Sequence, residues 1–193
     1  MINTTIKHIL AASVVACACG QAVAADEHVP AVTEYVNENV MPWLTDPIVV
    51  NAVKAQNDKN AGISQADIDA LDQKWRAGVD GGDTTLIEDV LANELSDFLR
   101  SRQAESGGTI TEVFVMDNKG LNVGQSDVTS DYWQGDEGKW QKTYGMGPSA
   151  VFVDEVEKDE STQTLQSQAS VTIADEAGNP IGAITIGIDL SSI

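Results

Sequence analysis

The pattern of hydrophobic and polar positions changes once along the chain, from a helical period to a strand period. Apolar residues in 32–44 recur at helical spacing, and Pro42 leaves open whether this segment is one kinked helix or two. Asp46-Pro47, an N-cap followed by proline at the first helical position, opens a second segment that runs to about residue 56. The first part of the chain is therefore predicted to be helical.

Two further helices are predicted before the strands begin. Ser64 and Asp67 form a capping-box pattern at the start of a helix in which Trp75 is expected to be a core anchor. After a glycine-containing turn at 80–83, the apolar spacing predicts one continuous helix over 85–100.

From residue 109 the sequence has the β-rich composition and alternation of strands. The predicted strands are 109–116, 121–125, 150–156, 165–173 and 181–190. In the last strand, Ile184 and Ile186 form one face, whereas Thr185 and Gly187 on the other face leave space for something other than large side chains. Helices followed by strands with short hairpins predict an α+β fold.

Composition and charge narrow the class of function. The chain has 193 residues, with 30 Asp and Glu against 11 Lys and Arg, and a formal net charge of -19. This excess of acid argues against nucleic-acid partners and anionic membrane surfaces, which bind clustered cations. The length suits a single domain, and a hydrophobic content of 42% is ordinary for a globular fold.

Residues 1–25 have the tripartite pattern of a secretory signal peptide. A cation at Lys7 precedes an apolar run, and small residues at Ala22 and Ala24 form an A-x-A cleavage site. Cleavage there predicts a single mature domain, residues 26–193, in the periplasm or outside the cell. Lipoprotein processing at Cys17 is the less favoured alternative.

Cleavage would also remove cysteine and histidine side chains, which can act as nucleophiles, as bases or as metal ligands, from the mature domain. Both cysteines and one of the two histidines lie in residues 1–25, so only His28 would remain. Thiol catalysis, Cys- or His-ligated metal sites and a Ser-His-Asp triad are therefore not expected. The sequence has no Ca²⁺-loop spacing and no Gly-rich phosphate loop followed by a helix. We expect a protein that is not an enzyme and holds no cofactor or metal.

The long connection 126–148 is the main candidate for function. It contains four of the ten aromatic residues of the chain, together with Lys139 and Lys142. The four rings are Tyr132, Trp133, Trp140 and Tyr144. Aromatic walls with a few charged groups over one face of a sheet are typical of a small-ligand pocket. The alternative is that the rings only pack at the open end of the sheet. For Trp140 and Tyr144, which a short helix can place on one face, packing and ligand contact are weighed equally.

The order of elements and the segment TEVFVMDNKGLNVGQSDVTSDYWQGDEGKWQKTY resemble the extracytoplasmic Cache (PAS-like, PDC-type) sensor domain family. A strand ending in Asp117, a D-x-x-G turn, an aromatic loop and a final G-x-I-x-I-G strand carry the resemblance. It implies a long N-terminal helical segment packed on a five-stranded antiparallel sheet of order 2-1-5-4-3. The ligand would lie under the loop on the other face.

The resemblance also implies a function and partners. Family members bind small metabolites such as carboxylates, amino acids or amines, and pass the signal through a membrane helix to an output module. This sequence ends at Ile193, just after the last strand, so we expect a stand-alone binding protein that presents its ligand to a membrane receptor. A homodimer through the N-terminal helix is compatible with this picture. The alternative is a non-enzymatic interaction module that uses the acidic surface and has no small-molecule ligand.

The resemblance places a set of pocket residues by position. They are Asp131, Tyr132, Trp133, Trp140, Lys142 and Tyr144, with Phe114 or Met116 at the floor. Lys142 would pair with a ligand carboxylate, and Asp131 or Asp154 would accept a hydrogen bond from an amine. The arginine of the family's amino-acid motif has no clear counterpart, so amino-acid binding is not specifically implied.

Overall fold

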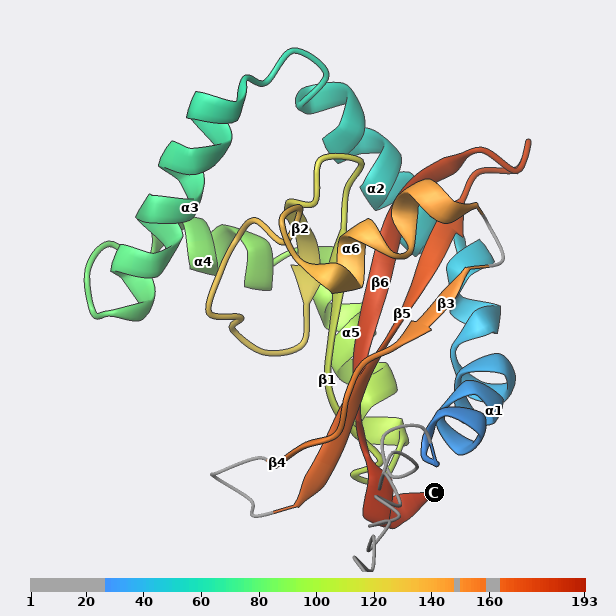
Figure 1. Ribbon diagram of the computed structural model, residues 1–193. Coiled ribbons are helices and arrows are strands. Elements are labelled where there is room, and N and C mark those ends of the chain that lie inside the picture. Colours follow the sequence, from blue (N-terminus) through green and yellow to red (C-terminus); the bar gives the residue numbers. More distant parts are fainter. Residues whose placement is uncertain (1–26, 148–149, 159–163) are drawn as a thin grey trace, which may run out of the picture.

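The computed structural model describes residues 27–147, 150–158 and 164–193, and the predicted signal peptide, with Cys17, lies outside these ranges. The helices are α1 (Val29–Asn39), α2 (Pro47–Lys59), α3 (Gln65–Val79), α4 (Thr85–Leu91), α5 (Glu94–Glu105) and α6 (Gly138–Gln141), with 3₁₀ turns η1 (Met41–Thr45), η2 (Tyr144–Met146) and η3 (Leu190–Ser192). The strands are β1 (Ile110–Met116), β2 (Asn122–Gln125), β3 (Val151–Val153), β4 (Glu157–Lys158), β5 (Leu165–Ala174) and β6 (Pro180–Asp189). Figure 1 shows an α+β fold with helices behind the sheet and α6 in front of it.

The sheet is antiparallel, with the strand order β2-β1-β6-β5-β3. In chain order of the five predicted strands this is 2-1-5-4-3, so the predicted topology is confirmed. The predicted strand 150–156 is shorter than expected, because β3 ends at Val153. A two-residue strand, β4, pairs separately with β5.

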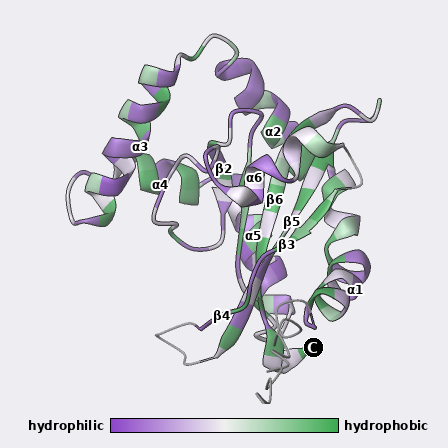
Figure 2. Cartoon of the chain, viewed as in Figure 1, coloured by the Kyte–Doolittle hydropathy of each residue, from purple (hydrophilic) through white to green (hydrophobic). Residues whose placement is uncertain are grey.

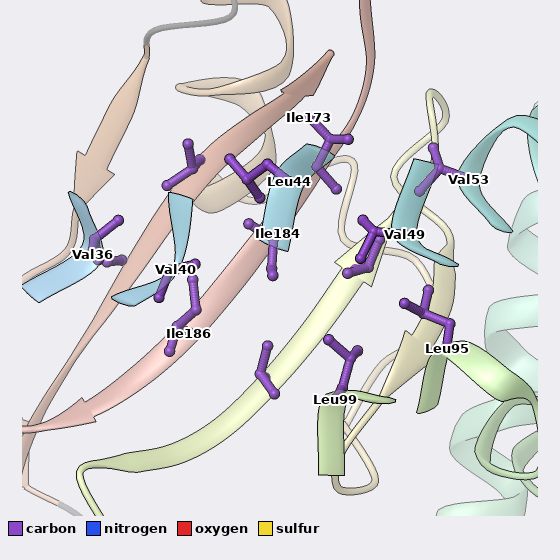
Figure 3. Packing of buried hydrophobic residues seen from close by; sticks show 14 of the residues in the cluster. Val36, Val40, Leu44, Val49, Val53, Leu95, Leu99, Ile173, Ile184 and Ile186 are labelled. Carbon is purple, nitrogen blue, oxygen red and sulfur yellow. The ribbon is translucent and has the colours of Figure 1, made fainter. Parts of the chain in front are cut away.

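The main core lies between the sheet and the helices α1, α2 and α5. Figure 3 shows aliphatic side chains from both layers meeting there. Ile184 and Ile186 of β6 are fully buried in this core. They belong to one cluster with Val36 of α1, Val49 of α2 and Leu99 of α5. Burying each such side chain stabilises the fold by about 1.5–3 kcal/mol relative to exposure.

The N-terminal segment forms two helices rather than one kinked helix. α1 ends at Asn39, and the 3₁₀ turn η1 contains Pro42. Asp46 then caps α2, since its Oδ1 accepts a hydrogen bond from the backbone N–H of Ile48 at 2.9 Å. The predicted N-cap and Pro47 at the first helical position are confirmed.

The prediction of one helix over 85–100 is wrong, because the chain breaks between α4 and α5. Asn93 caps α5, and its Oδ1 accepts a hydrogen bond from Ser96 N–H at 2.8 Å. Its Nδ2 donates to the carbonyl of Val123 in β2 at 2.7 Å. This bond ties the break between the two helices to the sheet.

The helices α3 and α4 form a helical arm (65–91) that projects to one side of the sheet in Figure 1. The capping box of Ser64 and Asp67 is present at its start. Figure 2 shows hydrophilic residues over much of α3, in contrast to the hydrophobic stretch of β6. Trp75 is fully buried in the small core of this arm, as predicted. Within the described ranges no helix is long and apolar enough to cross a membrane.

Candidate functional site

The loop face of the sheet, opposite the main core, is the face that the sequence assigns to a ligand. Directly paired residues of antiparallel strands lie side by side on one face. One such row, which we name the central row, crosses five strands and consists of Gln125, Phe114, Thr185, Ser170 and Phe152. Two small hydroxyl side chains therefore lie at its centre, with an aromatic ring on each side.

The two hydroxyl groups of the central row are bonded to each other. Ser170 Oγ and Thr185 Oγ1 lie 2.9 Å apart, and both residues are fully buried. A hydroxyl pair has two hydrogens, and the bond between the two oxygens uses one of them. The second hydrogen is therefore a donor with no other acceptor among the described residues.

The residues 138–146, which we name the roof segment, cover this face. Trp140 and Tyr144 stack with ring centroids 4.9 Å apart, so the predicted placement on one face is confirmed. Trp140 packs on Phe114 and Met116, and its Nε1 donates to the carbonyl of Asp117 at 3.2 Å. Burial, with the nearby charge of Asp117, raises the pKa of Tyr144. Phe114 and Met116 thus lie beneath the roof segment, and their role as the floor of a pocket stays a prediction.

Two lysines of the roof segment lie over the two aromatic flanks of the central row. The Nζ of Lys139 is 5.5 Å from the ring centroid of Phe114, and the Nζ of Lys142 is 4.1 Å from that of Phe152. Lys139 also pairs with Glu137 at 2.8 Å, and its side chain is only 14% exposed. Lys142 has no carboxylate within ion-pair distance among the described residues. Ammonium groups therefore flank the hydroxyl pair on both sides.

A carboxylate and a carboxamide that are hydrogen-bonded to each other lie one row further along the same face. Gln168 Nε2 donates to Glu112 Oε1 at 2.7 Å, and both residues are partly exposed. Asp154 follows β3 at this end of the sheet. Its carbonyl accepts hydrogen bonds from a ring nitrogen of His28 at 2.9 Å and from Ser167 Oγ at 2.8 Å. Asp154 is thus held by its backbone, beside the row that contains Gln168.

Asp131, Tyr132 and Trp133 lie at the junction with the helical arm, apart from the roof segment. The backbone N–H groups of Tyr132 and Trp133 both donate to Asp72 Oδ1, at 2.9 and 3.0 Å. Tyr132 stacks on Trp75 at 5.3 Å, and burial raises its pKa well above the ordinary value. These contacts give Tyr132 a packing role, and ligand contact stays a prediction for all three residues.

Arg76 joins the same junction through two carboxylates. Its Nε donates to Asp72 Oδ2 at 2.7 Å, and its Nη2 lies 2.9 Å from Asp131 Oδ1. The hydrogen bond to Asp72 raises the pKa of the guanidinium, which stays charged. The carboxylate of Asp131, proposed from the sequence as an acceptor for an amine, therefore already has a cationic partner.

Two glycines hold the loop against the D-x-x-G turn. Gly120 adopts a φ of 81°, which is in the left-handed region that favours glycine. A Cβ added to Gly120 would lie 2.5 Å from the Cα of Gly135. Trp133 Nε1 donates to the carbonyl of Lys119 beside this contact, at 2.8 Å. The backbones of the turn and the loop therefore lie close together three residues before the roof segment begins.

An open groove of about 570 Å³ lies on the other side of the molecule, between α2, α5 and β2. Its lining includes Ile48, Ala52 and Leu95, and none of the nine residues proposed from the sequence. Gln56 and Asn93, two of its polar residues, already donate to groups of the 117–123 segment. Two of the groove's amides are therefore occupied, and we keep the loop face as the candidate site.

Sequence reasoning did not select Lys139, Ser170 or Thr185 as site residues. Strand alternation places Thr185 on the correct face, but its burial depends on the roof segment. Within the described residues no group of three or more potential metal ligands is brought together.

No family model and no curated protein matches the sequence. The structure is similar to the ligand-binding domain of the Campylobacter jejuni chemoreceptor Tlp3 in complex with 4-methylisoleucine, at 13% identity and a TM-score of 0.39, covering 78% of this chain and 63% of that one. It is also similar to the ligand-binding domain of the Pseudomonas fluorescens chemoreceptor CtaA in complex with L-alanine, at 15% identity and a TM-score of 0.34, covering 86% and 60%. The chain spans less than two thirds of either match.

Proposed function

We propose that the chain is an exported, non-enzymatic sensor-type domain that binds a small metabolite with a carboxylate group on the loop face of its sheet. As a stand-alone domain it would present the bound state to a membrane partner. The observation that carries the proposal is the position of Lys139 and Lys142 on the two sides of the hydroxyl pair. Two of only 11 cations in a chain with 30 acids are gathered over this one face.

The chemistry of the central row suits an organic anion. An ammonium group and a hydroxyl group both donate to a carboxylate, and charge-assisted bonds are the stronger kind. Lys142 has no described carboxylate partner, and the hydroxyl pair has one unused hydrogen. Phe114 and Phe152 supply the apolar walls that a small-molecule site needs. Donors therefore outnumber acceptors at the centre of the face.

The same face can also accept an amine. Glu112 lies two residues before Phe114 on β1, about 7 Å along the strand. Its carboxylate bonds only one amide hydrogen of Gln168 among the described residues, and it is partly exposed. A ligand with an ammonium group near its carboxylate would therefore find a partner for each group.

Ligand entry requires the roof segment to move. Ser170 and Thr185 are fully buried beneath it, so a ligand can reach their hydroxyl groups only if the roof segment lifts. Trp140 lies in this segment and stacks on Tyr144. Binding is therefore expected to change tryptophan fluorescence as well as stability.

Calorimetry with a panel of small carboxylates, and with their matched neutral amides or esters, tests the proposal. We expect the double variant Lys139→Met, Lys142→Met to weaken binding of a carboxylate about tenfold, which corresponds to about 1.4 kcal/mol. The control is Lys74→Met, because Lys74 is an exposed lysine of α3. Its removal should leave the affinity unchanged.

Two outcomes would contradict the proposal. A broad panel that gives neither heat nor a shift in melting temperature would leave the acidic interaction module as the better interpretation, since ligands that bind the native state stabilise it. Equal loss of affinity in the double variant and in Lys74→Met would remove the loop face as the site.

A further inference from the structure

Three carboxamide side chains are buried together at one end of the central row. This amide cluster consists of Asn122, Gln125 and Gln134, each no more than 2% exposed. Asn122 and Gln125 are three residues apart, yet both pair with residues that lie beneath the roof segment, namely Met116 and Phe114. The register shift between Val115 and Met116 makes this possible, because a bulge adds one residue to one strand.

The hydrogen bonds of the cluster fix how each amide is oriented. The carbonyl of Asp131 accepts from Asn122 Nδ2 at 3.1 Å and from Gln134 Nε2 at 2.9 Å. Asn122 Nδ2 also donates to Gln125 Oε1 at 3.1 Å. Turning over either Asn122 or Gln134 would bring its oxygen against the carbonyl oxygen, and turning over Gln125 would bring two nitrogens together. The orientation shown is therefore the favourable one.

This orientation leaves one polar atom of each amide without a partner. Among the described residues, Asn122 Oδ1, Gln134 Oε1 and Gln125 Nε2 are buried and make no hydrogen bond. Each such atom costs about 1–3 kcal/mol while it stays buried and unpaired. The unpaired atoms of the cluster are thus two acceptor oxygens and one donor nitrogen. A neutral group with N–H donors and a carbonyl acceptor, such as a primary carboxamide or a ureido group, is complementary to it.

The cluster adjoins the proposed carboxylate site. Gln125 is the direct neighbour of Phe114 in the central row, and Lys139 lies over the ring of Phe114. Neighbouring strands are about 5 Å apart. A chain of four or five carbons can therefore place one end at Lys139 and the other at the amide cluster.

We infer that the ligand of the loop face carries a primary carboxamide or ureido group, bound by Asn122, Gln125 and Gln134, at the opposite end from its carboxylate. This inference rests on the proposed function and adds the ligand class. It distinguishes monoamides of short dicarboxylic acids from dicarboxylates, fatty acids and simple amines.

Matched probe pairs test the inference by calorimetry on the purified protein. Succinamate and monomethyl succinate have the same four-carbon acyl chain and one carboxylate each, but only the amide has N–H donors. Glutaramate and monomethyl glutarate form a second pair that is one carbon longer. We expect the better amide to bind at least tenfold more tightly than its ester.

The outcomes separate this inference from the proposed function. If ester and amide bind equally in both pairs, the ligand class is wrong while carboxylate binding on the loop face stands. That result would mean that the three amide atoms are served by ordered water, since one water molecule can donate twice and accept once. If none of the four probes nor any other carboxylate binds, the proposed function fails and this inference fails with it.

Variants assign the amide preference to the cluster. Gln134→Leu is expected to bring the affinity ratio of amide to ester close to one, with little change for the ester. The matched control is Gln103→Leu, because Gln103 donates its amide hydrogens to Thr111 O and Asp127, outside the cluster. An unchanged ratio in Gln134→Leu would overturn the assignment.

A spectroscopic measurement covers the case in which Gln134→Leu does not fold. In the unmodified protein, the side-chain NH₂ signal of Gln125, assigned with Gln125→Glu, should shift when succinamate is added. Monomethyl succinate should leave it in place. A Gln125 signal that responds equally to both probes would contradict a direct contact with the amide.

Discussion

The two faces of the β5–β6 pair are built from alternate residues of the same strands, yet they differ in what fills them. On the helix face, Ile184 and Ile186 are packed against aliphatic side chains from three helices. On the loop face, Ser170 and Thr185 are equally buried but meet each other through a single hydrogen bond. The comparison teaches that alternation in one strand separates the residues that stabilise the fold from those available for a ligand.

The largest expected effect lies on the helix face. Ile186→Ala removes a fully buried side chain and is expected to destabilise the protein by about 2–5 kcal/mol, because transfer and cavity costs add. Urea unfolding monitored by circular dichroism measures this change. If Ile186→Ala lowered the free energy of unfolding no more than a polar substitution at the adjacent Thr185, the two faces would not differ in their contribution to stability.

A smaller loss is expected where the loop joins the helical arm. Asp72→Asn should destabilise the protein by about 2 kcal/mol, since hydrogen bonds to a charged group are worth more than neutral ones. Asp72 accepts from the backbone of Tyr132 and Trp133. Hydrogen exchange of these two amides should become faster, whereas in the exposed-site control Asp69→Asn it should not. Unchanged protection in Asp72→Asn would contradict this role of Asp72.

A loop-face substitution should cost less again. Thr185→Val keeps the volume but removes one partner of the hydroxyl pair, so we expect a loss of about 1 kcal/mol. Adding Ser170→Ala should cost less than the sum of the single changes, because both partners of one bond are then gone. A double-mutant cycle in urea measures the difference. Strict additivity would contradict a direct interaction between the two hydroxyl groups.

The smallest effect is expected outside both faces, at the turn before α4. Hydrogen bonds from the Thr85 hydroxyl and backbone N–H, with Lys74, lower the pKa of Asp83 to about 2. A lowered pKa in the folded state means that the stabilisation is full above the unfolded pKa of about 3.9 and is lost as pH falls through about 2. The stability difference between Asp83→Asn and the unchanged protein should therefore shrink between pH 5 and pH 2. The exposed Asp58→Asn serves as a control, and a constant difference for Asp83→Asn across this range would contradict the assignment.

Local patterns in the sequence predict the elements whose signals are local. The capping box of Ser64 and Asp67, and the cap at Asp46, need only neighbouring residues and are present as predicted. The break between α4 and α5 was missed because Asn93 makes its decisive bond to Val123, thirty positions away. The strand order followed from the family resemblance, since periodicity alone does not specify which strands pair.

The candidate site shows the same division. The stacking of Trp140 and Tyr144 followed from their spacing of four residues. The placement of Tyr132 could not be predicted, because it depends on Asp72 and Trp75, some sixty positions earlier in the chain. The hydroxyl pair and the amide cluster also combine residues from separate strands and the loop, and no short motif records such contacts.

The contact between Gly120 and Gly135 has a consequence for how this protein can vary between species. A side chain at Gly120 would collide with the backbone of Gly135, and one at Gly135 would collide with the indole of Trp133. When a large residue crowds a neighbour, a smaller neighbour can restore the fit, but glycine has no side chain left to shorten. A substitution at Gly120 therefore has no compensating change at position 135. In a library of all single substitutions, we expect these two positions to be among the least tolerant in the chain.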